Sequence, residues 1–426
     1  MRSTKPRAFR DPVHDIISWK DEPELGRIVG ALIDTREVQR LRHVRQLGLA
    51  SLVFHGAEHS RFAHSLGVAH LARRMCDRVA ADLEPGDRIA IIAAALLHDV
   101  GHAPFSHVME RVFDFHHEDY SAAIVLDPDS EVNAVLAEVD ATLPQQVADI
   151  LAGRWDHWGR AIVSSQLDAD RGDYLLRDAH MTGVEVGRYD LERILLLLDH
   201  DDAGLIVGAG AFESIEGYLI ARYHMYRLVY FHRAVRAAEC MLEMVFARAG
   251  WLIAQGDTSL VPDNALGTLM RRERVSPGAW ADLGEFHAWA LLSSWRDHGD
   301  NVLSTLARDL MARRLFRSSE RDLGERHERV EDEDALVQSI YDALAPNERY
   351  LFFVDEARDV PYRPYLPQII DPSQAIRVRD RDGRIEHIEA RSPLVRALAD
   401  ASYRLRRWYY HPMVKPRVRS ILEDAT

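Results

Sequence analysis

The strongest constraint on the fold is an unbroken apolar run at residues 89–97 (IAIIAAALL), which ends directly in His98 and Asp99. A helix that is apolar on every side must be surrounded by other elements. The run therefore predicts a central buried helix, with Asp87 as its N-cap. An ordinary core helix does not end in two possible metal ligands followed by further imidazoles, so this helix end is the first candidate for a functional site.

Composition narrows the class of protein. The chain has 426 residues, 47% apolar and 28% charged, which suits one large domain with appendages or two domains. The formal net charge of -14 argues against a protein that wraps nucleic acid by bulk charge, so nucleic acid is not an expected partner. There are only two cysteines, the first residues show no apolar signal core, and no apolar run is long enough for a membrane span. We expect a cytoplasmic protein with no membrane-spanning helix.

Helical periodicity dominates up to about residue 315. Residues 9–19 predict an extended start or a small hairpin. Thr35 fits the N-cap and Gly48 the stop of one helix, and Gly183 fits the stop of another. Further helices are expected at residues 22–33, 64–79, 117–126, 130–139, 144–151 and 212–250.

The C-terminal part differs in composition and period. Residues 317–335 are densely charged with mixed signs, which predicts a solvated linker or an exposed helix. Alternation of period two then predicts strands at residues 349–357 and 375–390, with a hairpin turn at Asp382-Gly383. Residues 393–410 are expected to form a helix that packs on this sheet. We expect a mainly α protein with a core at 1–316, a charged linker or exposed helix at 317–345, and a smaller α+β lobe at 346–426.

Four possible metal ligands lie in three helical segments: His64, His98, Asp99 and Asp170. Imidazole and carboxylate together suit Fe, Mn or Zn, and carboxylate also suits Mg. An open coordination position would let bound water act as a nucleophile near neutral pH. Taken singly, His64 is more often a helix-start residue and Asp170 a surface acid. Their order and spacing around the His98-Asp99 pair favour a divalent metal site.

The helix that carries Asp170 presents further polar groups. Asp170, Tyr174, Arg177 and Asp178 lie at i, i+4, i+7 and i+8, which places them on one helical face. Tyr174 could stack on a sugar or hydrogen-bond to it, and Asp178 could accept from a hydroxyl. The alternative is an exposed face with Arg–Asp pairing.

Histidines and arginines elsewhere fit phosphoester chemistry. His102, His107 and His117 follow the metal pair, and an imidazole can donate a proton to a leaving oxygen near neutral pH. At least one of the three is expected to be catalytic and at least one structural. Arg61 and Arg222 suit phosphate binding. Aromatic residues near Arg222, notably Tyr230, could lie under a sugar or base, although core packing at helical spacing explains them equally well.

The order His64, His98-Asp99, Asp170 resembles the H…HD…D signature of the HD-domain metal-dependent phosphohydrolases. Longer segments are similar to the deoxynucleoside triphosphate (dNTP) triphosphohydrolases, both bacterial members and the catalytic core of the vertebrate sterile-alpha-motif and HD-domain enzyme. The segments are DPVHD, IDTREVQRLRHVRQLG, VFHGAEHSRFAHSLGVAHLA, LLHDVGHAPFSHVME, HHEDYS and DADRGDYLLRDAHMTGV. The resemblance covers residues 7–250 strongly and 345–412 weakly. It implies a helical HD-domain core, assembly into dimers or tetramers, and hydrolysis of a dNTP to deoxynucleoside and inorganic triphosphate.

The resemblance also assigns roles by position. His64, His98, Asp99 and Asp170 match metal ligands, and His102, His107 and His117 match catalytic-pocket histidines, with His117 nearest to the proton-transfer residue. The substrate contacts fall in two groups: triphosphate contacts at Arg61, Arg171 and Arg222, and sugar contacts at Gln46, Leu47, Tyr174, Asp178 and Tyr230. Arg171 stands where the vertebrate enzyme has Lys, which keeps the charge and changes the geometry.

A regulatory site is implied as well. Asp34, Gln39 and Arg42 match residues that read guanine in an activator such as dGTP or GTP, and a helix surface with local pairs is the alternative. Arg7, Arg193 and Arg233 could provide basic contacts to activator nucleotides. Gly208 and Gly210 replace basic residues of the vertebrate enzyme, which leaves open whether a second activator pocket exists.

We therefore expect a metal-dependent dNTP triphosphohydrolase. The alternatives are an HD-domain phosphohydrolase that acts on a monophosphate, a cyclic nucleotide or a signalling nucleotide, and a non-enzymatic nucleotide sensor.

Overall fold

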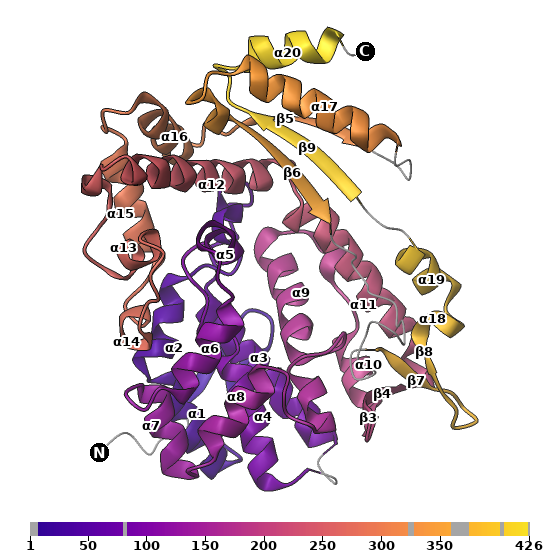
Figure 1. The fold of residues 1–426 in the computed structure, drawn as a ribbon. Coiled ribbons are helices and arrows are strands. Elements are labelled where there is room, and N and C mark those ends of the chain that lie inside the picture. The colour runs from indigo at the N-terminus through magenta and orange to yellow at the C-terminus, as the bar shows by residue number, and fades with distance from the viewer. Residues whose placement is uncertain (1–6, 80–82, 323–327, 359–374, 401–403, 425–426) are drawn as a thin grey trace.

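The computed structural model describes residues 7–79, 83–322, 328–358, 375–400 and 404–424 (Figure 1). The expectation of a mainly helical protein is confirmed. The helices up to residue 311 are α1 (Pro23–Ile33), α2 (Arg36–Arg40), α3 (Arg61–Arg78), α4 (Pro85–Leu97), α5 (His107–Phe113), α6 (His117–Leu126), α7 (Glu131–Val139), α8 (Leu143–Leu151), α9 (Ala169–Thr182), α10 (Leu191–Leu196), α11 (Phe212–Met225), α12 (Arg233–Ala254), α13 (Ala265–Met270), α14 (Pro277–Trp280), α15 (Glu285–Trp295) and α16 (Asn301–Met311).

Helix α4 is the buried centre of the N-terminal helices, as its apolar run predicts. Every side chain from position 90 to position 97 is at most 1% exposed. Helices α1, α3 and α8 pack around it. The helix begins at Pro85, and Asp87 lies in its first turn, where its carboxylate accepts a hydrogen bond from Gln146. The prediction that Asp87 is the N-cap is therefore wrong, because proline at the first position starts the helix.

Side-chain caps fix the starts of α3 and α9, which pack against each other. Ser60 accepts a hydrogen bond from the backbone N–H of Ala63 at the start of α3, and Asp168 accepts from Arg171 at the start of α9. Gly183 ends α9 in the left-handed region, at φ 76°, as expected. Helix α3 begins at Arg61, three residues before the predicted start, so Arg61 and His64 lie on one helix.

The helix predicted between Thr35 and Gly48 is shorter than expected. Thr35 does cap α2, but the helix ends at Arg40 and is followed by a 3-10 turn. Arg45 then forms an isolated antiparallel bridge with Ser60. The chain leaves the helix early because this bridge brings Gln46 and Leu47 alongside the start of α3.

In the described part of the chain, no helix combines the length and apolar character needed to cross a membrane.

Short strands complete the fold. The small N-terminal hairpin is confirmed as β1 (Ala8–Asp11) and β2 (Asp15–Ser18). A four-stranded sheet has the order β3-β4-β7-β8, in which β4 and β7 run parallel, and a three-stranded sheet has the order β5-β9-β6. Their bounds are β3 (Leu198–Asp201), β4 (Gly204–Gly208), β5 (Arg317–Asp322), β6 (Phe352–Arg358), β7 (Arg377–Arg379), β8 (Ile385–His387) and β9 (Arg404–Tyr410). Figure 1 shows the three-stranded sheet above α12.

Two expectations for the C-terminal part are confirmed only in part. Where a charged linker or an exposed helix was expected, residues 317–322 form strand β5, residues 323–327 lie outside the described part, and helix α17 (Glu328–Ala343) follows. The helix expected at 393–410 is α19 (Pro393–Asp400), then three residues outside the description, then β9. Trp408, Tyr409 and Tyr410 are buried, and β9 is the central strand of its sheet. The last helices are α18 (Ile388–Arg391) and α20 (Lys415–Asp424).

Candidate active site

Four side chains from three helices converge at one end of α4. His64 comes from α3, His98 caps the C-terminus of α4, Asp99 follows it, and Asp170 lies in the first turn of α9. Oδ1 of Asp170 lies 3.0 Å from Nε2 of His64 and 3.6 Å from Nε2 of His98. Oδ1 of Asp99 lies 3.2 Å from Nε2 of His98.

Neighbouring groups orient both imidazoles. Nδ1 of His64 lies 2.8 Å from the buried carboxylate of Asp173, one turn beyond Asp170 on α9. Nδ1 of His98 lies 2.8 Å from the carbonyl oxygen of Ala95. Each Nδ1 thus faces an acceptor, which leaves Nε2 as the atom that points to the cluster, as in metal-binding histidines. Nε2 of His98 is buried and has no hydrogen-bond partner among the described residues.

The donor set fits a divalent metal. Ligand atoms held at about 2.1 Å from one metal lie roughly 3–3.5 Å apart, close to the separations found here. His64, His98 and Asp99 form one of the groups of described residues able to hold an ion. Asp170 adds a second carboxylate, whose side chain is 31% exposed and faces the pocket. Together they are two imidazoles and two carboxylates with access from solvent.

Burial and close pairing set the protonation of the groups in the cluster. Burial disfavours the charged imidazole, but Asp170 and Asp173 outweigh burial and raise the pKa of His64 to about 10. Burial also disfavours a charged Asp99, yet the neighbouring Arg61 and His98 hold the pKa of Asp99 well below its usual range. The carboxylates are therefore ionised and available to a cation.

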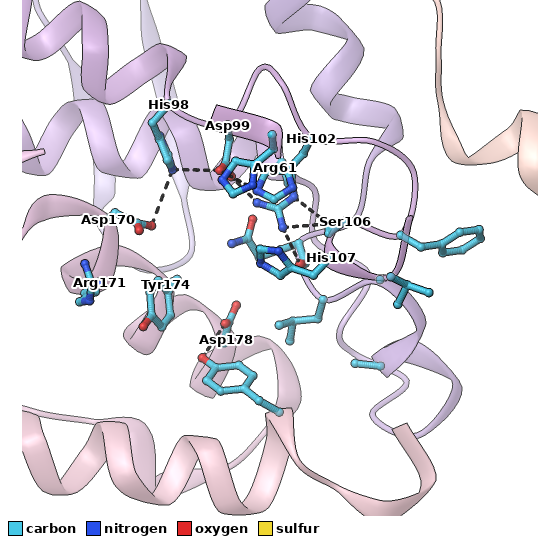
Figure 2. A pocket seen from close by; sticks show the side chains of 18 of the residues that line it. Arg61, His98, Asp99, His102, Ser106, His107, Asp170, Arg171, Tyr174 and Asp178 are labelled. Carbon is cyan, nitrogen blue, oxygen red and sulfur yellow. Dashed lines mark hydrogen bonds and ion pairs between the residues drawn. The ribbon is translucent and has the colours of Figure 1, made fainter. Parts of the chain in front are cut away.

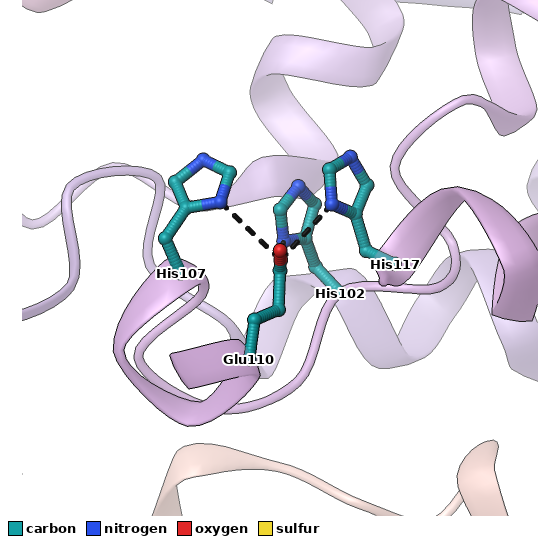
Figure 3. A group of neighbouring side chains, drawn as sticks. All are labelled: His102, His107, Glu110 and His117. Atoms are coloured by element: carbon teal, nitrogen blue, oxygen red, sulfur yellow. Dashed lines mark hydrogen bonds and ion pairs between the residues drawn. The ribbon is translucent and has the colours of Figure 1, made fainter. Parts of the chain in front are cut away.

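A second cluster adjoins the first (Figure 3). Oε1 of Glu110 on α5 lies 3.3 Å from Nδ1 of His102, 3.3 Å from Nδ1 of His107 and 2.9 Å from Nδ1 of His117. The rings of His102 and His117 stack at 3.7 Å. Nε2 of His102 lies 3.3 Å from Oδ1 of Asp99, which links the two clusters.

Glu110 is the functional candidate that the sequence analysis missed. It lies three residues after His107, on the same face of a helix, and that spacing was the available signal. Burial disfavours its charge, but the three imidazoles outweigh burial and lower its pKa, so it is a carboxylate. Burial, with the charge of Arg61 nearby, lowers the pKa of His102 to about 3, so this ring is neutral. Only His107 of the three is largely open to solvent, at 62% exposure.

Both clusters open into one pocket of about 590 Å³ (Figure 2). The described lining residues include every predicted sugar contact: Gln46, Leu47, Tyr174, Asp178 and Tyr230. The hydroxyl of Tyr230 donates to Oδ2 of Asp178 at 2.8 Å, and Oδ1 of Asp178 lies 2.8 Å from Nε2 of His59. Oε1 of Gln46 is buried and has no partner among the described residues.

The three predicted triphosphate arginines occupy different positions. Arg61 lines the pocket, donates to Asp99 at 2.5 Å and holds Ser106. Arg171 lines the pocket and donates to the carbonyl oxygen of Ser165 at 2.6 Å, and it also pairs with Asp168. Arg222 is buried behind the wall, where it donates to Oε1 of Gln166 at 2.7 Å. Arg61 and Arg171 are therefore the two predicted triphosphate arginines that line the pocket, whereas Arg222 is not among the lining residues.

Arg177 does not belong to the pocket. Asp170, Tyr174 and Asp178 line it, but Arg177 is 0% exposed and lies against α3 near Gly67, where it pairs with Asp173 and Asp11. The expected Arg–Asp pairing is therefore present, but it is buried and not on an exposed face. Arg177 lies only about 20° around the helix from Asp170, so its carboxylate partners, and not the helical position, keep its side chain out of the pocket.

The predicted activator residues form a small surface group. Asp34 pairs with Arg7 at 2.5 Å, Gln39 donates to the carbonyl oxygen of Ile33, and Arg42 donates to Oε1 of Gln39 at 2.9 Å. Arg42 also lies over the ring of Phe62. This arrangement is compatible with either interpretation, so the activator role stays a prediction. Arg193 donates to the carbonyl oxygen of Gly210.

Comparison with known proteins matches this architecture to a family. The HD domain matches residues 61–178, which contain all four candidate metal ligands, and the HD associated region matches residues 189–276. The uncharacterized Bacillus subtilis protein YwfO is 34% identical over 433 residues, covering 98% of each chain.

Two further relatives carry functional names. The deoxynucleoside triphosphate triphosphohydrolase SAMHD1 homolog of Dictyostelium discoideum is 30% identical over 269 residues, or 57% of this chain and 51% of that protein. The chain thus spans about half the length of that relative. The crystal structure of a phosphohydrolase, BT4208 of Bacteroides thetaiotaomicron, superposes with a TM-score of 0.74 at 27% identity, covering 96% of this chain and 100% of the other.

Proposed function

This chain belongs to the HD-domain phosphohydrolases, whose domain binds a divalent metal, and from that premise we propose that it hydrolyses dNTPs to deoxynucleoside and inorganic triphosphate. The observation that supports this most is one pocket that joins the HD metal ligands to the Asp178–Tyr230 pair. A phosphate-cleaving centre alone would suit many esters. A buried acceptor and an aromatic hydroxyl beside it suit a nucleoside sugar.

Metal chemistry and the arginines would address the phosphate. A divalent metal held by His64, His98, Asp99 and Asp170 supplies Lewis acidity and lowers the pKa of bound water. Arg61 and Arg171 place two guanidinium groups in the pocket wall, where they neutralise phosphate oxygens. In the proposed step, a water oxygen forms a bond to the α-phosphorus and the bond between phosphorus and the 5′-oxygen breaks.

The leaving 5′-oxygen needs a proton, and the histidine cluster can supply it. His107 and His117 each direct Nδ1 to Glu110, which leaves Nε2 to face away from that carboxylate. A carboxylate bonded to one nitrogen stabilises the protonated ring, which can then donate from the other. His102 has a pKa of about 3 and is buried, so it suits a structural role.

Polar and aromatic side chains of the pocket would recognise the sugar of the substrate. We infer that Oε1 of Gln46 accepts a hydrogen bond from a 3′-hydroxyl, because it is buried without a partner among the described residues and leaving it so is unfavourable. Tyr174 and Tyr230 pack edge to face at 6.2 Å between ring centres. We infer that these rings crowd the 2′ position and select deoxyribose.

Regulation is part of the proposal, carried by the resemblance. We infer that dGTP or GTP binds near Asp34, Gln39 and Arg42, where Arg7 adds a positive charge. We also infer from the resemblance that the chain assembles into a dimer or tetramer.

Product analysis tests the proposed function. Protein with Mg²⁺ or Mn²⁺ is incubated with each dNTP, alone and with dGTP or GTP added, and products are separated by ion exchange. We expect deoxynucleoside and inorganic triphosphate, and no product from Asp170→Ala. Monophosphate and pyrophosphate would show a different phosphohydrolase reaction. Metal-loaded protein that turns over no dNTP under any condition would contradict the proposal.

A further inference from the structure

One wall of the pocket is a segment of unusual backbone between α11 and α12. Residues Tyr226–Tyr230 form a π-helix, and a turn at residues 231–232 leads into α12. Tyr226, Val229, Tyr230, Phe231, Val235 and Arg236 all line the pocket. A π-helix is rare and its hydrogen bonds are poorer than those of an α-helix, so such a segment needs support from its surroundings.

The C-terminal sheet holds this segment at two points. Arg236 makes a two-pronged ion pair with Asp355 of β6, with Nε to Oδ2 at 2.9 Å and Nη2 to Oδ1 at 2.5 Å. Arg407 of β9 donates to the carbonyl oxygen of Phe231. Asp355 and Arg407 are directly opposite each other in the β6–β9 register. One cross-strand pair therefore contacts Phe231, directly after the π-helix, and Arg236, in the first turn of α12.

The side chains that make these two contacts are largely buried, which makes the geometry of the contacts important. Asp355 is 5% exposed and Arg407 7%, and the side chain of Arg236 is 15% exposed. Buried ions are costly unless their geometry is good, and a paired fork of two N–H···O bonds fixes both distance and orientation. Arg236 also pairs with Glu239 on its own helix, so its position relative to α12 is set as well. The contact joins residues 119 positions apart in the chain.

We propose that Asp355 and Arg407 are positioning residues for substrate, through which the C-terminal sheet sets the place of Tyr230 and Phe231 in the pocket wall. The inference rests on the proposed function for its substrate. Tyr230 sits one residue before the carbonyl that Arg407 holds, and its hydroxyl must reach Asp178. Neither positioning residue is assigned a role in bond breaking. Their loss should therefore weaken substrate binding in the ground state and the transition state alike.

The first arm of the test needs no substrate. Amide hydrogen exchange is measured on the full-length, metal-loaded wild type and on Asp355→Asn, Arg407→Leu and Arg407→Lys. Exchange in peptides covering residues 226–236 should be faster in Asp355→Asn and Arg407→Leu. Lys keeps an N–H donor for the Phe231 carbonyl, so Arg407→Lys should restore part of the protection. Unchanged exchange in all three variants would overturn the inference.

The matched control is Arg417→Gln. This residue belongs to the same lobe and pairs with Glu348, but the pair is on the surface and its arginine side chain is 47% exposed. It should leave exchange at residues 226–236 at the wild-type rate. Equal acceleration in the control would mean general loosening of the lobe and would overturn the inference.

The second arm measures dNTP hydrolysis by the same proteins. We expect Asp355→Asn and Arg407→Leu to raise KM roughly tenfold, the size of one lost charge-assisted hydrogen bond, with kcat within about twofold. Arg407→Lys should lie between them and the wild type. A loss confined to kcat, or faster exchange with unchanged KM, would overturn the positioning role. If the variants show the expected exchange pattern but the wild type hydrolyses no dNTP, the proposed function is contradicted. The effect of Asp355 and Arg407 on residues 226–236 would still be established.

Discussion

Nδ1 of His64 lies 2.8 Å from Oδ2 of Asp173, and both side chains are buried. A histidine held this way presents Nε2 to a metal in a fixed direction. We predict that Asp173→Asn lowers the affinity for Mn²⁺ about 10- to 100-fold, the usual cost of losing a carboxylate behind a ligand histidine. Titration calorimetry of the metal-free protein measures this.

His14→Gln is the control for that measurement. His14 lies 2.6 Å from the other oxygen of Asp173 and does not contact the metal cluster directly. Removing it should change the affinity for Mn²⁺ less than about threefold if the His64–Asp173 contact is the one that matters. The same loss of affinity in both variants would point to general disruption around Asp173 and contradict the prediction.

Glu110 should matter for turnover more than for binding. We predict that Glu110→Gln lowers kcat by about 10²-fold, because the imidazoles that deliver the proton lose the negative charge that orients them. KM should change little. Steady-state kinetics across the pH range test this, with Glu118→Gln, another pocket residue on the helix of His117, as a control expected within a few fold of wild type. A rise in KM with unchanged kcat would assign Glu110 to substrate binding.

Gly101 allows close approach of the chain that carries His117. A Cβ at this position would lie 2.0 Å from the carbonyl oxygen of His117 and 2.5 Å from the amide nitrogen of Ser121. We predict that Gly101→Ala displaces the start of α6 and lowers kcat about 10²-fold, since errors near 1 Å in catalytic groups have that cost. A Cβ at Gly86 would meet no neighbouring atom within 4 Å, so Gly86→Ala should be as active as wild type. Comparable activity in both variants would show that turnover does not depend on the present position of His117.

His70 should make the protein sensitive to acid. Burial, with positive charge nearby from His14, Arg73 and Arg74, lowers its pKa to about 4. The unfolded chain takes up a proton below its ordinary pKa of 6.5, whereas the folded protein does so only near pH 4. This difference removes at most about 1.4 kcal/mol of stability per pH unit as pH falls through that window.

Replacing His70 isolates its contribution to the pH dependence of the unfolding free energy. The difference in unfolding free energy between wild type and His70→Gln should be constant above pH 7.5 and should move in favour of the variant by pH 5. Urea unfolding at both pH values measures this. A difference that does not vary with pH would show that His70 has an ordinary pKa.

The sequence was most informative where one element decided its own environment. The apolar run before His98 predicted a surrounded helix, and Thr35 and Gly183 predicted where helices start and stop, because caps act locally. The four candidate metal ligands could be named because of their order and spacing around the His98-Asp99 pair, and the structure brings them together. Asp173 was missed because only the packing of α3 on α9 brings it to His64. Glu110 was missed because it acts through the histidines, although its spacing from His107 on α5 was an available signal.

Expectations failed where distant segments decide the conformation. Residues 404–410 (RLRRWYY) show no alternation, because β9 is buried and holds arginines against acids on its neighbours. Arg177 shares a helical face with Asp170 and Tyr174, but the buried carboxylates of Asp11 and Asp173 bind its guanidinium outside the pocket. Neither partner strands nor a carboxylate 166 residues away can be read from local periodicity.

The strand order β5-β9-β6 also bears on synthesis of the protein. Strands β5 and β6 do not pair with each other, and each waits for β9, which begins at Arg404. On the ribosome, the metal ligands and the histidine cluster leave the exit tunnel long before β9 does. The nascent chain can therefore build the candidate metal centre early, while the pocket wall that Asp355 and Arg407 contact is completed only after β9 has been synthesised. A chain truncated before Arg404 would carry the candidate centre without its finished pocket.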